Sequence, residues 1–124
     1  MYREIAHVAD LAFEITFRDE EELFNDIADI LRSKVEGIFL TEEKVEEYDV
    51  KNVLEDSIFD IGNEMIYNID SGWAPISVKF DDGKLQVRYK KVDLASFPVK
   101  ALTYHMLKVE KEGKNRKVRV VLDV

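Results

Sequence analysis

The first patterned stretch of the chain alternates apolar and polar residues over positions 11–18. A period of two is typical of a strand with one buried face. Directly after it, Asp19 stands where a helix N-cap is expected, and Glu22 follows three residues later as its capping-box partner. Apolar residues then recur at helical spacing, so the pattern predicts a helix over residues 20–34.

The middle of the chain predicts an exposed segment and then a second helix. Residues 41–51 are mostly charged and indicate a loop followed by a short exposed strand. The second helix is expected to be capped by Asn52 and to end at Ser71 and Gly72, because these residue types favour the two ends of a helix. Gly62 lies inside this helix, where glycine costs about 1 kcal/mol relative to alanine. A close packing contact is therefore expected at Gly62.

The last third of the chain returns to a period of two and predicts two hairpins. Alternating apolar residues flank a turn at residues 81–83. A second pair of strands is expected over residues 99–111 and 117–124. The order of these elements predicts an α+β fold, in which antiparallel sheet packs with two helices as a two-layer sandwich. We expect a single domain over residues 1–124.

Composition narrows the class of protein. A chain of 124 residues with 46% hydrophobic content can form one core. No apolar run approaches the roughly 18–20 residues of a membrane-spanning helix, and the first residues lack the apolar region of a signal peptide. We therefore expect a cytoplasmic protein with no membrane contact. The absence of cysteine excludes disulfides, zinc–thiolate sites and thiol nucleophiles.

The net charge of −8 is unevenly distributed along the chain. Residues 1–78 carry 20 acidic and 6 basic side chains, whereas residues 79–124 carry 6 acidic and 12 basic ones. An acidic chain repels a phosphate backbone, so autonomous RNA binding is disfavoured. The basic C-terminal third either contacts RNA or an acidic partner, or simply carries solvated Lys and Arg on hairpin strands.

Two aspartates from distant parts of the sequence are candidate ligands of a hard cation. Asp123 is the penultimate residue, so its carboxylate has the main-chain oxygens and α-carboxylate of Val124 beside it. Ca²⁺ and Mg²⁺ take oxygen ligands, and Asp10, at the bend before the first patterned strand, would supply a second carboxylate. The residues alone leave a plainer alternative open, in which Asp10 caps a turn and Asp123 belongs to a frayed terminus.

Other chemistry-bearing side chains are few. The two histidines, His7 and His105, are each a conceivable ligand or general base, although a lone histidine on a patterned strand is more often packed or solvated. Lys100, taken by itself, is most simply a surface lysine. A metal-dependent hydrolase is disfavoured, because only two carboxylates are expected to converge and His7 would be the one obvious general base.

Four segments, in the same order along the chain, resemble the archease family. Residues 7–10 (His-Val-Ala-Asp) are similar to the family's early His-Thr-Ala-Asp, and residues 100–105 (Lys-Ala-Leu-Thr-Tyr-His) closely resemble its Lys-Ala-Val-Thr-Tyr-His signature. Residues 54–67 match its second helix, and residues 120–124 match its hydrophobic-Asp-hydrophobic ending. The resemblance covers nearly the whole chain.

This resemblance implies a cation site made of Asp10, Asp123 and the main-chain oxygen of Val124. The implied cofactor is a divalent cation, Ca²⁺ in the first place and Mg²⁺ as the alternative. It also implies a functional role for Lys100. For His7 and His105 it implies only orienting or packing roles.

The resemblance implies a function as well. Archeases assist RtcB-type RNA ligases in tRNA splicing and RNA repair, by promoting attachment of GMP to the ligase's own histidine and its repeated turnover. The alternative is a chaperone or modulator of RNA-modifying enzymes such as tRNA methyltransferases, with a purely structural cation. In both cases the protein is a non-catalytic partner of another protein and meets tRNA or RNA indirectly. The oligomeric state stays open.

Overall fold

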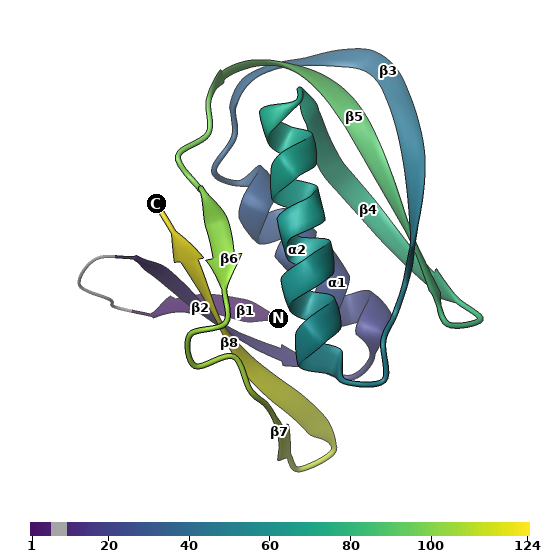
Figure 1. Cartoon of the computed structure of the whole chain (residues 1–124), viewed down its shortest axis with the longest axis vertical. Coiled ribbons are helices and arrows are strands. Elements are labelled where there is room, and N and C mark those ends of the chain that lie inside the picture. Colours follow the sequence, from purple (N-terminus) through teal and green to yellow (C-terminus); the bar gives the residue numbers. More distant parts are fainter. Residues whose placement is uncertain (6–9) are drawn as a thin grey trace.

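A computed structural model describes residues 1–5 and 10–124 (Figure 1). The described elements begin with β1 (Tyr2–Ile5), β2 (Leu11–Phe17), α1 (Glu20–Arg32), β3 (Glu36–Asp49) and α2 (Leu54–Asp70). They continue with β4 (Trp73–Asp81), β5 (Lys84–Ser96), β6 (Ala101–Thr103), β7 (Val109–Glu112) and β8 (Asn115–Asp123).

The strands of the described residues form two antiparallel sheets. The larger has the order β1-β2-β8-β6, and β7 also pairs with β8; the smaller has the order β3-β5-β4. Both helices contact both sheets, α1 through β4 and β2 and α2 through β4 and β6 (Figure 1). Of the helices in the described residues, neither is long and apolar enough to cross a membrane. These findings confirm the predicted α+β class.

Helix α1 forms as its sequence predicts. The Asp19 side chain accepts a hydrogen bond from the Glu22 N–H at 2.9 Å and so caps the first turn. The helix ends at Arg32, two residues before the predicted limit. Its fully buried stripe packs into the core: Leu23, Phe24, Ile27, Ala28, Ile30 and Leu31.

Helix α2 starts later than predicted. The N-cap residue is Val53, which has no side-chain oxygen, so the prediction that Asn52 caps this helix was wrong. The helix ends as expected, and the following Gly72 adopts a φ of 92°. The expected packing contact at Gly62 is confirmed, because a Cβ there would lie 2.6 Å from Cδ1 of Leu102. Gly62 thus allows β6 to approach α2 closely.

Strand β3 is longer than the exposed strand expected within residues 41–51. It starts at Glu36 and pairs with β5 across a register shift between Phe39 and Glu43. Most of its side chains are exposed, and half-buried positions alternate with exposed ones only over residues 44–49. Strand β3 is held in an extended conformation by its hydrogen bonds to β5, and the sequence pattern of β3 alone does not predict this pairing.

The predicted strand over residues 99–111 is broken into two. Residues 104–108 separate β6 from β7, and the Leu107 N–H closes a turn by donating to the Tyr104 carbonyl at 3.0 Å. Met106 in this turn has a φ of 57°. Both short strands pair with the same edge of β8, and among the residues that the structure describes no strand pairs with Arg119 and Val120 on that edge.

Asparagine side chains of the helices cover one edge of each sheet. On α1, the Asn25 amide donates to the Val78 carbonyl at 2.9 Å and accepts from the Val78 N–H at 3.0 Å. On α2, Asn63 makes the same reciprocal pair with Leu102, at 2.9 Å in both directions. Two further α1 side chains bond main-chain groups of β4: Glu21 and Arg32. In these places a helix side chain occupies the position of a neighbouring strand.

Candidate functional site

The start of β2 and the end of β8 lie side by side at one end of the larger sheet. Leu11 pairs with Leu122. Asp10 is the bend residue directly before β2, and Asp123 is the last residue of β8. The two aspartates proposed from the sequence therefore lie at the same end of the larger sheet.

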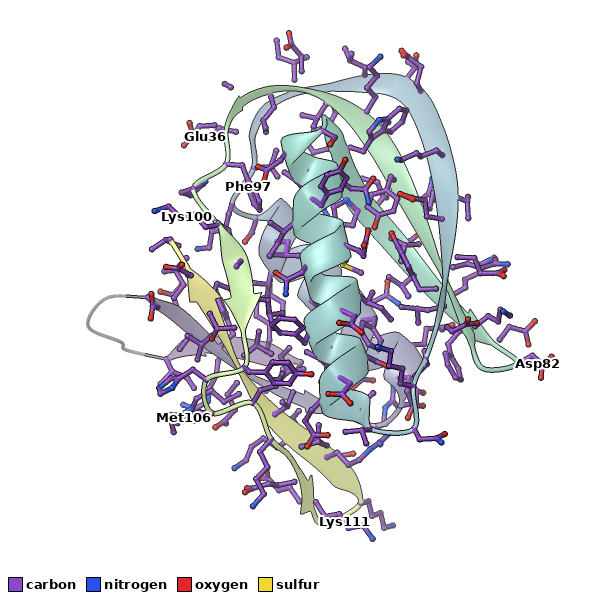
Figure 2. The ribbon with its side chains drawn as sticks, in the orientation of Figure 1. Glu36, Asp82, Phe97, Lys100, Met106 and Lys111 are labelled. Atoms are coloured by element: carbon purple, nitrogen blue, oxygen red, sulfur yellow. The ribbon has the colours of Figure 1, made fainter. Side chains whose placement is uncertain are left out.

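The start of β6 completes this end of the sheet. Ala101 pairs with Asp123, and the Lys100 N–H donates to the Asp123 carbonyl at 2.7 Å. Asp123 and Lys100 are exposed, and Val124 is 40% exposed. Figure 2 shows Lys100 beside the C-terminal end of β8. Asp10, Lys100, Asp123 and Val124 thus belong to one surface, which we call the sheet-end site.

The two histidines are placed differently. His105 lies beyond the other end of β6, where its N–H donates to the Thr103 hydroxyl at 3.2 Å. In Figure 2 the neighbouring Met106 and Lys100 lie at opposite ends of β6. The structure therefore does not bring His105 to the sheet-end site. His7 lies outside the described residues.

The donor atoms of the sheet-end site are oxygens. Two carboxylates and the main-chain oxygens of the last residues suit a hard cation such as Ca²⁺ or Mg²⁺. Within residues 1–5 and 10–124, no group of three or more His, Cys, Asp or Glu side chains converges on one point. A cation held by the described residues at this site would consequently depend on main-chain oxygens as well as on Asp10 and Asp123.

Asn63 positions the site, although its place in the sequence did not predict this role. Its amide bonds both main-chain groups of Leu102, which follows Ala101, the strand partner of Asp123. Asn63 thereby fixes β6 to α2. The available signal was one polar amide beside the buried face of an amphipathic helix that carries several other polar residues, which is not distinctive without the structure.

Tyr104 fastens the connection after β6 to α2. Its ring stacks on Phe59, with centroids 4.3 Å apart and 18° between the planes, and its hydroxyl donates to the Asp56 carboxylate. Close by, the Val109 N–H donates to the Glu55 carboxylate at 3.0 Å. The first turns of α2 therefore hold the segment that joins β6 to β7.

The hydrogen bond to Asp56 raises the pKa of Tyr104 to about 12. Because folding favours the neutral phenol, its contribution to stability is complete below the unfolded-state pKa of about 10 and is lost as the pH rises toward about 12. We expect Tyr104→Phe to be less stable at pH 8 and to lose less stability between pH 10 and 12. Urea unfolding over this range measures both effects.

The difference in stability between the wild type and Tyr104→Phe isolates the effect of Tyr104, because the other groups that titrate at high pH affect the stability of both proteins equally. Parallel pH profiles for the wild type and Tyr104→Phe would show that the Asp56 bond does not contribute to folding.

A sequence model of the archease protein family matches residues 2–124. The chain belongs to the archease family. The protein archease of Thermotoga maritima is 41% identical over 125 residues, which cover 99% of each chain.

Two solved structures share the archease fold. A crystal structure from Thermotoga maritima, described as an archease and possible chaperone, has a TM-score of 0.85 and 38% identity, over 100% of this chain and 98% of that one. The solution structure of protein 1598 of Methanobacterium thermoautotrophicum has a TM-score of 0.68 over 99% of this chain and 98% of that one. At 21% identity the second likeness concerns the fold alone.

Proposed function

We propose that this archease is a non-catalytic, cation-dependent activator of an RtcB-type RNA ligase, which promotes guanylylation of the ligase and its turnover in tRNA splicing or RNA repair. The observation that carries the proposal is the strand register at the sheet-end site. Asp10 directly precedes β2, Asp123 ends β8, and Lys100, just before β6, donates its N–H to the Asp123 carbonyl. These are the positions that the family resemblance associates with function.

The residues of the sheet-end site have distinct roles in this proposal. Asp10 and Asp123 provide negative charge, and Val124 adds a main-chain oxygen. When bound, a divalent cation supplies the positive charge that allows two neighbouring carboxylates to remain close. Lys100 is exposed, and its main-chain N–H bonds the Asp123 carbonyl, so in this proposal its side chain contacts an anionic group of the partner. The site thus presents charge at and just beyond the ends of β2, β6 and β8.

Guanylylation of the cognate ligase tests the proposal. Transfer of labelled GMP from GTP to the ligase is measured with and without the purified protein, in the presence of Ca²⁺, Mg²⁺ or a chelator. We expect stimulation that needs the protein and is lost with the chelator. An unchanged rate of GMP transfer in every condition would contradict the proposal.

The second candidate is a chaperone or modulator of RNA-modifying enzymes such as tRNA methyltransferases, in which the cation is purely structural. The description of the Thermotoga maritima structure as a possible chaperone favours it. Under this alternative, chelation lowers the melting temperature, and activity survives wherever the fold does. Melting curves recorded beside the GMP-transfer assay separate the two candidates.

A further inference from the structure

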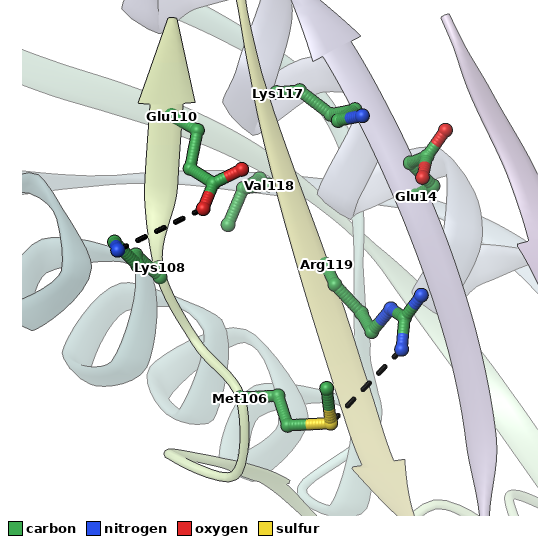
Figure 3. A pocket seen from close by; sticks show the side chains of 7 residues that line it. All are labelled: Glu14, Met106, Lys108, Glu110, Lys117, Val118 and Arg119. Atoms are coloured by element: carbon green, nitrogen blue, oxygen red, sulfur yellow. Dashed lines mark hydrogen bonds and ion pairs between the residues drawn. The ribbon is translucent and has the colours of Figure 1, made fainter.

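A groove of about 340 Å³ lies on the face of the larger sheet that points away from the helices (Figure 3). It opens where residues 104–108 interrupt the strands along β8. Three cationic side chains line it: Lys108, Lys117 and Arg119. Lys117 and Arg119 are two residues apart on β8 and therefore share a face, about 6.6 Å apart along the strand. The buried Val118 between them faces the core.

Arg119 forms no ion pair with Glu14, the carboxylate directly across from it on β2. One oxygen of Glu14 accepts two hydrogen bonds from Arg3, at 3.0 and 3.2 Å. Arg119 instead lies 4.0 Å from the sulfur of Met106. Within the part of the chain that the structure describes, no ion pair involves Arg119. Its guanidinium is therefore available to an external anion.

The two lysines are only loosely paired. Lys108 lies 3.8 Å from Glu110, and both side chains are more than half exposed, at 75% and 57%. Lys117 lies 3.4 Å from Glu112. Exposed ion pairs of this kind contribute at most about 1 kcal/mol. Exchanging them for contacts with a ligand anion therefore costs little.

One edge of β8 beside the groove is interrupted. On this edge, β7 pairs up to Val118 and β6 resumes at Val121. Within residues 1–5 and 10–124, Arg119 and Val120 between them have no strand partner on this side.

We infer that this groove binds the phosphate groups of single-stranded RNA directly. A guanidinium recognises phosphate with paired hydrogen bonds, and lysines add point charges. The spacing of Lys117 and Arg119 is comparable to that of successive phosphates in an extended strand. All of the groove's lining residues except Glu14 come from the basic C-terminal third of the sequence.

The acidic side chains of the molecule limit the affinity. Glu14 and Glu110 also line the groove, and the net charge is −8. Binding is consequently weak and sensitive to salt. This inference rests on the proposed function for its biological use, since it gives the activator of an RNA ligase its own contact with the ligase's RNA.

The test is fluorescence anisotropy of a 5′-labelled single-stranded oligouridine with the full chain, from 25 to 200 mM KCl. Three phosphate contacts predict a slope of log K against log salt of about −2, at about 0.7 for each contact. We expect Arg119→Ala to weaken binding about tenfold at low salt, as for a lost charge-assisted hydrogen bond. Lys117→Ala should also flatten the slope, and Glu14→Gln should strengthen binding.

Arg88→Ala is the matched control, because Arg88 is an exposed arginine on the outer face of the other sheet, in β5. An equal loss in Arg88→Ala would overturn the inference in favour of general electrostatics. No binding at 25 mM KCl, or full binding by both Arg119→Ala and Lys117→Ala, would also overturn it. Displacement by an oligoglutamate peptide as readily as by unlabelled RNA would assign the groove to an acidic protein instead.

The failure of this inference is distinguishable from that of the proposed function. Guanylylation of the ligase is measured without an RNA substrate, and there Arg119→Ala should stimulate as the wild type does. Thermal unfolding of each variant confirms that the sheet remains folded.

Discussion

Asp123→Asn is expected to abolish the stimulation of ligase guanylylation and to leave the fold intact. The substitution keeps the shape of the side chain but removes one of the two carboxylates at the sheet-end site. Because losing even a supporting residue around a metal typically costs 10–100-fold in affinity, we expect cation affinity to fall by at least about 100-fold. Calorimetric titration with Ca²⁺ and the GMP-transfer assay measure the two losses.

The matched control is Asp82→Asn, since Asp82 is an exposed aspartate in the β4–β5 turn, far along the chain from the sheet-end site. It should stimulate as the wild type does. Asp10→Asn should behave like Asp123→Asn, and the double variant should lose little more, because both residues act in one site. Retained stimulation in a variant that no longer binds a cation would instead support the chaperone alternative.

Asn63→Ala should lower the free energy of unfolding by about 2–4 kcal/mol. The substitution removes the partners of both main-chain groups of Leu102, a residue that is 1% exposed. A buried polar group left without a partner costs about 1–3 kcal/mol. Urea unfolding measures the loss, with Asn63→Asp as a partial variant that keeps the acceptor for the Leu102 N–H.

Asn63→Ala should also weaken cation binding at the sheet-end site. Leu102 follows Ala101, the strand partner of Asp123, so a loosened β6 should weaken cation binding even while most molecules remain folded. Glu64→Ala, one helical position away and exposed, is the control and should change stability by less than about 0.5 kcal/mol. If Asn63→Ala matched this control, the amide would not be what holds β6.

The spacing of apolar residues predicted those strands and helices in which one face is buried along the whole element. β2 covers residues 11–17 and α1 begins at Glu20, as expected, because alternation and helical spacing act within one element. The same reasoning missed β1, a short strand ordered by its pairing with β2. It also missed the start of β3 and the break after β6. These features depend on pairing between segments, which the local pattern does not record.

The candidate site was only partly accessible to sequence reasoning. Residue type and family resemblance singled out Asp10 and Asp123, but they lie 113 positions apart, and only the pairing of β2 with β8 places them at the same sheet end. The break in the strands beside Arg119 was equally hidden, since no glycine or proline marks residues 101–111. The cation itself stays a prediction that the titration above decides.

The asparagine contacts have a consequence for how other proteins can approach. A sheet edge with unpaired amides and carbonyls recruits foreign strands and so promotes domain swapping and fibrous aggregation. Here Asn25 and Asn63 terminate β4 and β6 much as a further strand would. We therefore expect a bound ligase to meet the sheet-end site through side chains and strand termini, and not by extending the sheet beyond β6.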